Sequence, residues 1–147
     1  MTNQKVILLA IGIIVFNLIL AFFNGFIGML TSPIAITAIT ALIGFKLVKT
    51  NPIIKTFILL CIIITNDIGI RLYSSGNYDQ VGQALIQISF AITMVPTLGI
   101  LLTAIFSVKN QIIRDKILAT FFFIGLIGIY VFLFNNLGPG WRFYEWN

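Results

Sequence analysis

Histidine is absent from this chain, and cysteine and acidic residues are scarce. The sequence holds no His, one Cys (Cys61) and four acids, which are Asp67, Asp79, Asp115 and Glu145. Zinc and haem sites depend on His and Cys ligands, and histidine-based acid–base catalysis, including the Ser-His-Asp triad, needs an imidazole. The glycine pairs Gly25-x-x-Gly28 and Gly125-x-x-Gly128 lie in apolar runs and lack the strand context of a phosphate-binding loop. We therefore expect no enzyme activity, no catalytic, cofactor-binding or metal-binding residues, and no cofactor.

Charged residues of any kind are also rare. They make up 9% of the 147 residues, whereas ordinary soluble domains contain roughly 25%, and 59% of the chain is hydrophobic. A soluble fold of this length cannot bury so much apolar surface, so lipid must cover most of it. The composition predicts an all-α integral membrane protein, a small polytopic helical bundle that forms a single transmembrane domain over residues 1–147.

Five apolar runs are candidates to cross the roughly 30 Å hydrocarbon core of a bilayer. They cover residues 6–24, 33–48, 52–73, 81–108 and 117–134, and an aromatic tail follows at 135–147. The run at 33–48 is the weakest, because its apolar part ends at Phe45, and a four-span bundle results if it does not cross. Gly25–Ser32 is expected to be a short turn, with Ser32 as N-cap and Pro33 as the first helical residue. Pro96 marks the expected kink in the fourth span, because proline removes a backbone hydrogen bond.

The Lys and Arg residues gather in alternate gaps between these runs. If all five runs cross, one side of the membrane receives seven cations, and the other receives only Arg71 and Arg142. Cationic residues are retained on the cytoplasmic side, so this pattern predicts a multi-pass protein of the cell (inner) membrane, with a cytoplasmic N-terminus and an external C-terminus. Because the cations lie at run ends, we interpret the net charge of +5 as a topology signal near anionic lipid and expect no nucleic-acid partner.

Asp67 is the only acid inside a predicted span, about 9 Å from the outer boundary if the span ends at Tyr73. Ionisable groups at such depth are costly and often functional. Arg71 follows one helical turn later in the favourable acid-first order, and Asn66 adds hydrogen-bonding capacity. We favour a structural ion pair over a proton or ion relay, and both interpretations stay open.

The fourth predicted span carries a broad polar side. Gln83 and Gln87 share one helical row, and Ser89, Thr93 and Thr97 form the neighbouring row. At similar depth, the two glutamines are expected partners for Asp67 and Arg71. The side is either a polar cavity open to the outer surface or an adhesive contact between helices, and we favour adhesion because it is the more common use.

Two further features bear on partners. Gly99, Thr103 and Ser107 form a small-residue series on the fourth span that permits close approach of another helix. The tail gathers aromatic and cationic side chains just beyond the last span. It suits an interfacial aromatic belt, which we favour, or an outward docking element. The candidate docking residues are Trp141, Arg142, Phe143, Tyr144 and Trp146.

Two functions from different classes fit these features. The favoured one is a non-enzymatic integral membrane subunit (a scaffold, anchor or accessory protein) of a larger membrane protein complex. It is indicated by the missing catalytic groups and the small mass outside lipid. The alternative is a small oligomeric channel or transporter with a polar path near Asp67 and the Gln83/Gln87 face. The expected partners are the lipid bilayer and other membrane subunits or further copies of this chain.

Overall fold

The computed structural model describes residues 2–73, 80–109 and 111–134 and shows five α-helices in these ranges. They are α1 (Asn3–Phe23), α2 (Gly25–Lys46), α3 (Pro52–Tyr73), α4 (Gln80–Phe106) and α5 (Ile113–Phe134). Each is long and apolar enough to cross a membrane. The predicted class of all-helical, multi-pass membrane protein is therefore confirmed.

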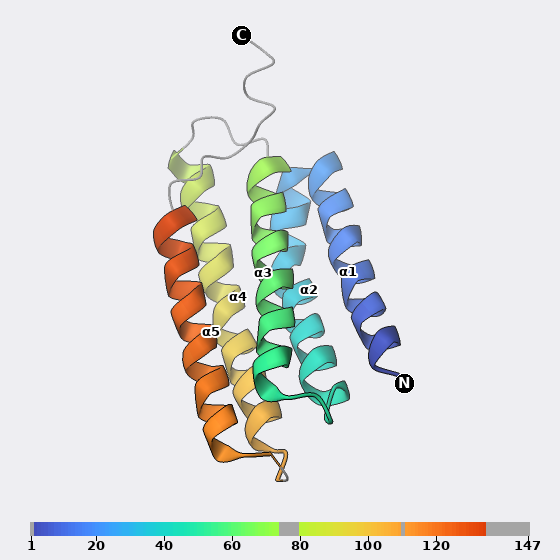
Figure 1. Cartoon of the computed structure of the whole chain (residues 1–147). Coiled ribbons are helices and arrows are strands. Elements are labelled where there is room, and N and C mark those ends of the chain that lie inside the picture. Colours follow the sequence, from blue (N-terminus) through green and yellow to red (C-terminus); the bar gives the residue numbers. More distant parts are fainter. Residues whose placement is uncertain (1, 74–79, 110, 135–147) are drawn as a thin grey trace.

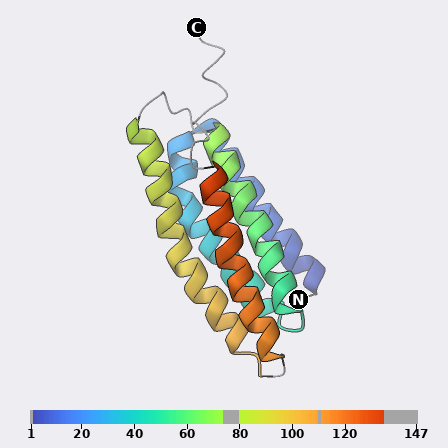
Figure 2. The ribbon, with the colours of Figure 1, turned by 60° about the vertical axis from the view of Figure 1, so that its left-hand side comes forward.

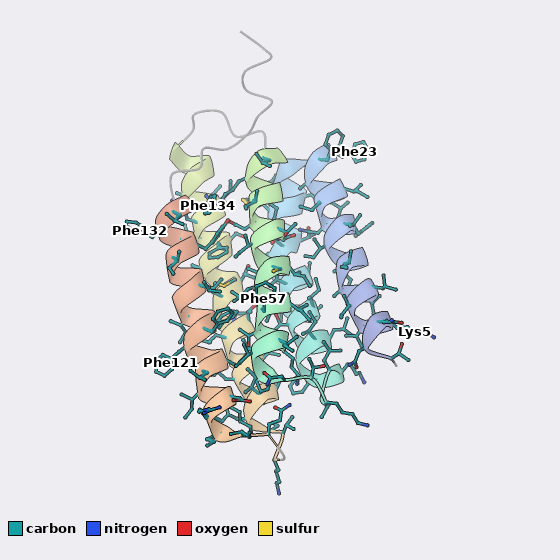
Figure 3. All side chains as sticks on the ribbon, viewed as in Figure 1. Lys5, Phe23, Phe57, Phe121, Phe132 and Phe134 are labelled. Carbon is teal, nitrogen blue, oxygen red and sulfur yellow. The ribbon has the colours of Figure 1, made fainter. Side chains whose placement is uncertain are left out.

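The five helices lie side by side in a bundle, and successive helices run in opposite directions (Figure 1). The start of α1 lies at the same end as the α2–α3 and α4–α5 connections, which we call the inner end. The α1–α2 turn and the last residues of α5 lie toward the opposite end, which we call the outer end. Lys5 and Phe23, at the two ends of α1, mark these ends in Figure 3. The termini of the helical bundle thus lie at opposite ends, as an odd number of spans requires.

The second helix corrects the expectation that residues 25–32 form a turn and that Pro33 opens a short span. α2 begins at Gly25, and the Asn24 side chain caps it by accepting a hydrogen bond from the Ile27 backbone N–H at 3.2 Å. Pro33 lies inside this helix. With 22 residues, α2 is about 33 Å long, so it is long enough to cross the membrane, as the five-span prediction expects.

The reason why α2 tolerates an internal proline is visible one turn earlier. Pro33 has no N–H to offer the Met29 carbonyl, which would otherwise lack its helical partner. The Ser89 hydroxyl of α4 donates to that carbonyl at 3.1 Å. A side chain from a neighbouring helix therefore replaces the missing backbone bond, as an apolar environment demands.

The other helices differ from the predicted spans mainly at their inner ends. α1 begins at Asn3, and α5 begins at Ile113, so that Arg114, Asp115 and Lys116 belong to its first turn. α4 continues through Pro96 without a break in helical structure, and the kink expected there remains a prediction.

Glycines let three helix pairs approach closely. A Cβ atom at Gly28 of α2 would lie 2.3 Å from the Cβ of Ala21 on α1, and one at Gly44 would lie 2.8 Å from that of Ala104 on α4. A Cβ at Gly69 of α3 would meet the Leu18 side chain at 2.3 Å. Small residues at helix contacts are the usual means of packing in membranes, where close approach supplies the dispersion energy. The α1–α2 and α2–α4 contacts therefore depend on Gly28 and Gly44, whereas at Gly69 the flexible end of the Leu18 side chain can move aside.

The two central helices are α2 and α3. An isoleucine- and leucine-rich core lies between them and their neighbours, and among the spans α3 has the largest buried share. α5 packs mainly on α3 and shares few contacts with α4. Turning the molecule by 60° shows α4 and α5 together at the inner end and separated toward the outer end (Figure 2). This separation positions the groove described below.

Candidate functional site

Asn66 connects three helices in the interior of the bundle. Its side-chain oxygen accepts a hydrogen bond from the Asn17 amide of α1 at 2.9 Å, and its own amide donates to the Ser32 hydroxyl of α2 at 2.6 Å. The Thr31 hydroxyl in turn donates to the Asn17 oxygen at 2.6 Å. We call these four side chains the amide cluster. Its amide groups partner each other and adjacent hydroxyls, so α1, α2 and α3 are joined by polar contacts in lipid surroundings.

Asp67 and Arg71 form the predicted ion pair one helical turn apart. The Arg71 Nε donates to Asp67 Oδ2 at 2.7 Å, and each residue is only 6% exposed. The Tyr130 hydroxyl of α5 donates to the same carboxylate oxygen at 2.5 Å. A buried carboxylate is tolerated where an opposite charge and hydrogen bonds compensate its lost hydration. The pair is therefore joined to α5 as well as held within α3.

The polar side of α4 is divided between two environments. Ser89 faces α2 through the Met29 carbonyl, and Thr93 is buried, its hydroxyl bonded to the Ser89 carbonyl at 2.7 Å. Gln87 is exposed and lines a groove together with Arg71. The Gln83 side chain lies outside the described residues, and so do Trp141, Arg142, Phe143, Tyr144 and Trp146 of the tail. Docking by the tail therefore stays a prediction.

A small void separates the two polar clusters from α4. It has a volume of about 10 Å³, which is the size needed for a single water molecule. Ser32, Asn66, Asp67, Ser89 and Thr93 supply its polar lining. The void is too small to conduct a solute in this conformation.

A larger groove opens on the other side of Arg71, between α4 and α5. Its volume is about 380 Å³. Most of its wall is apolar or aromatic, and it includes Phe90, Met94, Ile127 and Phe134; polar groups come from Arg71, Gln87 and Tyr130. Its lining residues come from α3, α4 and α5, and Figure 2 shows that α4 and α5 diverge toward the outer end.

Two lysines at the inner end have a role beyond topology. Lys55 is 0% exposed, and its ammonium donates to the Gly44 carbonyl in the last turn of α2 at 3.4 Å. Lys116 is also buried and donates to the Val108 carbonyl, just past the end of α4, at 2.5 Å. Cations near the carboxyl ends of helices satisfy terminal carbonyls and oppose the helix dipole. The other inner-end cations, Lys5, Lys46, Lys49, Lys109 and Arg114, are exposed.

Sequence reasoning missed several members of these clusters. Tyr130, the one tyrosine in the fifth predicted span, was not singled out as a partner for Asp67. Ser32 was interpreted as a helix cap, and Asn17 lies in an apolar run without a recognisable motif. Their common signal is a hydrogen-bonding side chain inside a span, since such groups seek partners in lipid.

The chemistry available here is hydrogen bonding and charge pairing. Across residues 2–73, 80–109 and 111–134, no three side chains among His, Cys, Asp and Glu gather where they could hold a metal ion. The chain matches no protein-family model, and neither a curated protein nor a solved structure shows significant similarity to it.

The amide cluster generates a direct test of its contribution to stability. Removing the Asn17 and Asn66 amides singly and together, as Asn17→Leu and Asn66→Leu, should give a coupling free energy of about 0.6 kcal/mol, with about 1.7 kcal/mol as the upper bound known for such bonds. Equilibrium unfolding in mixed micelles measures it. Thr65→Leu, next to Asn66 but exposed to lipid, serves as the control and should leave stability unchanged. Strictly additive single effects would show that the two amides do not interact.

Proposed function

We propose that this chain is a non-enzymatic subunit of a larger membrane protein assembly, oriented with its inner end in the cytoplasm. The observation that carries this proposal is the contrast between the interior and one outer face of the bundle. Inside, the side chains of the amide cluster bond among themselves, as do Asp67, Arg71 and Tyr130, and each group joins helices. These polar groups hold the helices of this chain together, since they form hydrogen bonds with neighbouring helices.

The lipid-facing surface meant here is the small-residue series toward the inner end of α4. Gly99, Thr103 and Ser107 are all exposed, and a Cβ atom at Gly99 would meet nothing within 4 Å. The hydroxyls of Thr103 and of Ser107, which directly follows α4, donate to the Gly99 and Thr103 carbonyls of α4 at 2.8 Å and 2.5 Å. The face is therefore flat and has its hydroxyls already bonded. These properties suit close packing of a helix from another subunit.

The bundle also presents little but lipid-facing surface. In the apolar stretch of each helix, the share of residues buried in the bundle is 17% for α5 and 28% for α1 and α4. Much of each helix surface is thus available for contact with other membrane proteins as well as with lipid. The short connections between helices add little surface outside the membrane for independent activity.

Substitution of Gly99 tests the proposed partner face. Gly99→Leu places a branched side chain on this face and should lower the amount of membrane protein that co-purifies in mild detergent by about tenfold. Gly12→Leu is the matched control. A Cβ atom at Gly12 likewise meets nothing within 4 Å, but Gly12 lies on α1, outside the proposed partner face. Isolation of the wild-type chain as a stable species without a stoichiometric partner would contradict the proposal.

A small oligomeric channel or transporter remains the second candidate, and one observation favours it. Thr56 of α3 and Thr97 of α4 are fully buried, and their hydroxyl oxygens have no hydrogen-bond partner in the part of the chain that the structure describes. Both lie toward the inner end, below the void beside Asp67. Unpaired buried hydroxyls are uncommon and costly, so they favour a path that admits water in another conformation.

Ion flux into proteoliposomes separates the two candidates. If Asp67 lines a path, Asp67→Asn should reduce proton or potassium flux by about tenfold, because the carboxylate no longer attracts the cation. Asp115→Asn, at the inner end of α5, provides an acid-to-amide control and should leave flux unchanged. Absent flux, or flux that Asp67→Asn does not alter, would remove the transport candidate.

A further inference from the structure

The Asp67–Arg71 pair presents its two charges to different cavities. Asp67 lines the void of about 10 Å³ in the interior, whereas Arg71 lines the groove of about 380 Å³ between α4 and α5. The groove lining holds Arg71 and no carboxylate among the residues that the structure describes. Although the ion pair is neutral as a whole, the groove therefore adjoins only its cationic member, Arg71.

Polar and apolar groups are also ordered along the groove. Arg71 is two residues from the end of α3, and Gln87 is the outermost α4 residue of the lining. From Gln87 to Met94 the lining follows about 10 Å of α4, and on α5 it extends inward to Ile127. The groove thus has polar groups near its outer end and an apolar floor directed toward the middle of the membrane. A phospholipid has the same order, with an anionic phosphate at the surface and a chain below it.

The Arg71 Nε–H that bonds to Asp67 is one of the five N–H groups that a guanidinium carries. Guanidinium groups bind phosphate oxygens in a fork geometry, even while part of the group is engaged elsewhere. Gln87 and the Tyr130 hydroxyl, which donates to Asp67, make this part of the lining polar. Since Val131 and Ala91 on the two walls are exposed, a chain enters sideways from lipid.

We propose that the groove between α4 and α5 binds one anionic phospholipid, whose phosphate contacts Arg71 and one of whose acyl chains lies along Phe90, Met94 and Ile127. This inference is independent of whether the chain is a subunit or a transporter. A helix from a partner is the competing occupant. The polar end beside Arg71 favours a lipid, because an apolar transmembrane helix offers no group for a guanidinium.

Native mass spectrometry of the full-length protein, delipidated in detergent, tests this proposal. The probes are phosphatidylglycerol, phosphatidylcholine with identical acyl chains, and inorganic phosphate alone. We expect one phosphatidylglycerol per chain, retained about tenfold more than phosphatidylcholine, and no retention of phosphate alone, which has no chain to fill the groove. Equal retention of the two lipids would overturn the proposal that the bound phospholipid is anionic, since both lipids carry a phosphodiester.

Variants locate the bound lipid. Ala91→Trp fills the groove from an exposed position and should lower phosphatidylglycerol retention by about tenfold, whereas Ala38→Trp, on an exposed position of α2, should not. Asp67→Asn combined with Arg71→Gln keeps the pair neutral and should abolish the preference for phosphatidylglycerol over phosphatidylcholine. Identical retention by Ala91→Trp and Ala38→Trp would overturn the proposal. Loss of a second protein chain from Ala91→Trp, with unchanged lipid, would assign the groove to a helix instead.

Discussion

The structure depends on the absence of water from the hydrocarbon core, because every polar group placed there needs a partner from the protein. The Met29 carbonyl illustrates this constraint. Pro33 removes its helical hydrogen bond, and the Ser89 hydroxyl of another helix supplies a replacement. Asn66 follows the same rule by bonding to Asn17 and Ser32, and Asp67 by bonding to Arg71 and Tyr130. Apart from the Asp67–Arg71 bond within α3, each of these bonds joins two different helices and therefore also determines which helices are neighbours.

The constraint acts on cations at the inner end as well. Lys55 and Lys116 are buried, yet each ammonium reaches a backbone carbonyl at or just beyond a helix end. Helix ends are the places where carbonyls lack partners, so one contact satisfies both groups. The other five inner-end cations stay exposed, and α4 and α5 diverge at the other end, where Arg71 lies beside the groove. In the part of the chain that the structure describes, the two ends therefore differ in chemistry, with exposed cations at the inner end and the buried Asp67–Arg71 pair toward the outer end.

Much of the fold was accessible from the sequence, because long apolar runs and the spacing of Asp67 and Arg71 are local properties. The start of α2 was not. The Ser32-Pro33 pattern is compatible with a helix start and also with a position inside a helix. The second case requires a donor from another helix for the Met29 carbonyl, and only the packing of Ser89 against α2 shows that one is present. Tyr130 was missed for a similar reason. Which residue of α5 faces Asp67 depends on how α5 packs on α3, and the apolar sequence of α5 shows no clear amphipathic side. Local periodicity therefore predicts the helices, whereas their polar partners depend on tertiary packing.

We propose that the five helices cross the membrane with the lysine-rich inner end in the cytoplasm. Single cysteines at Lys5 and Phe23, introduced in a Cys61→Ser background, test it most directly, since these residues lie at opposite ends of α1 (Figure 3) and are exposed. In intact cells, a membrane-impermeant maleimide should label Phe23→Cys, and it should label Lys5→Cys only after the membrane is permeabilised. Labelling of Lys5→Cys in intact cells, or of both positions from the same side, would contradict the account.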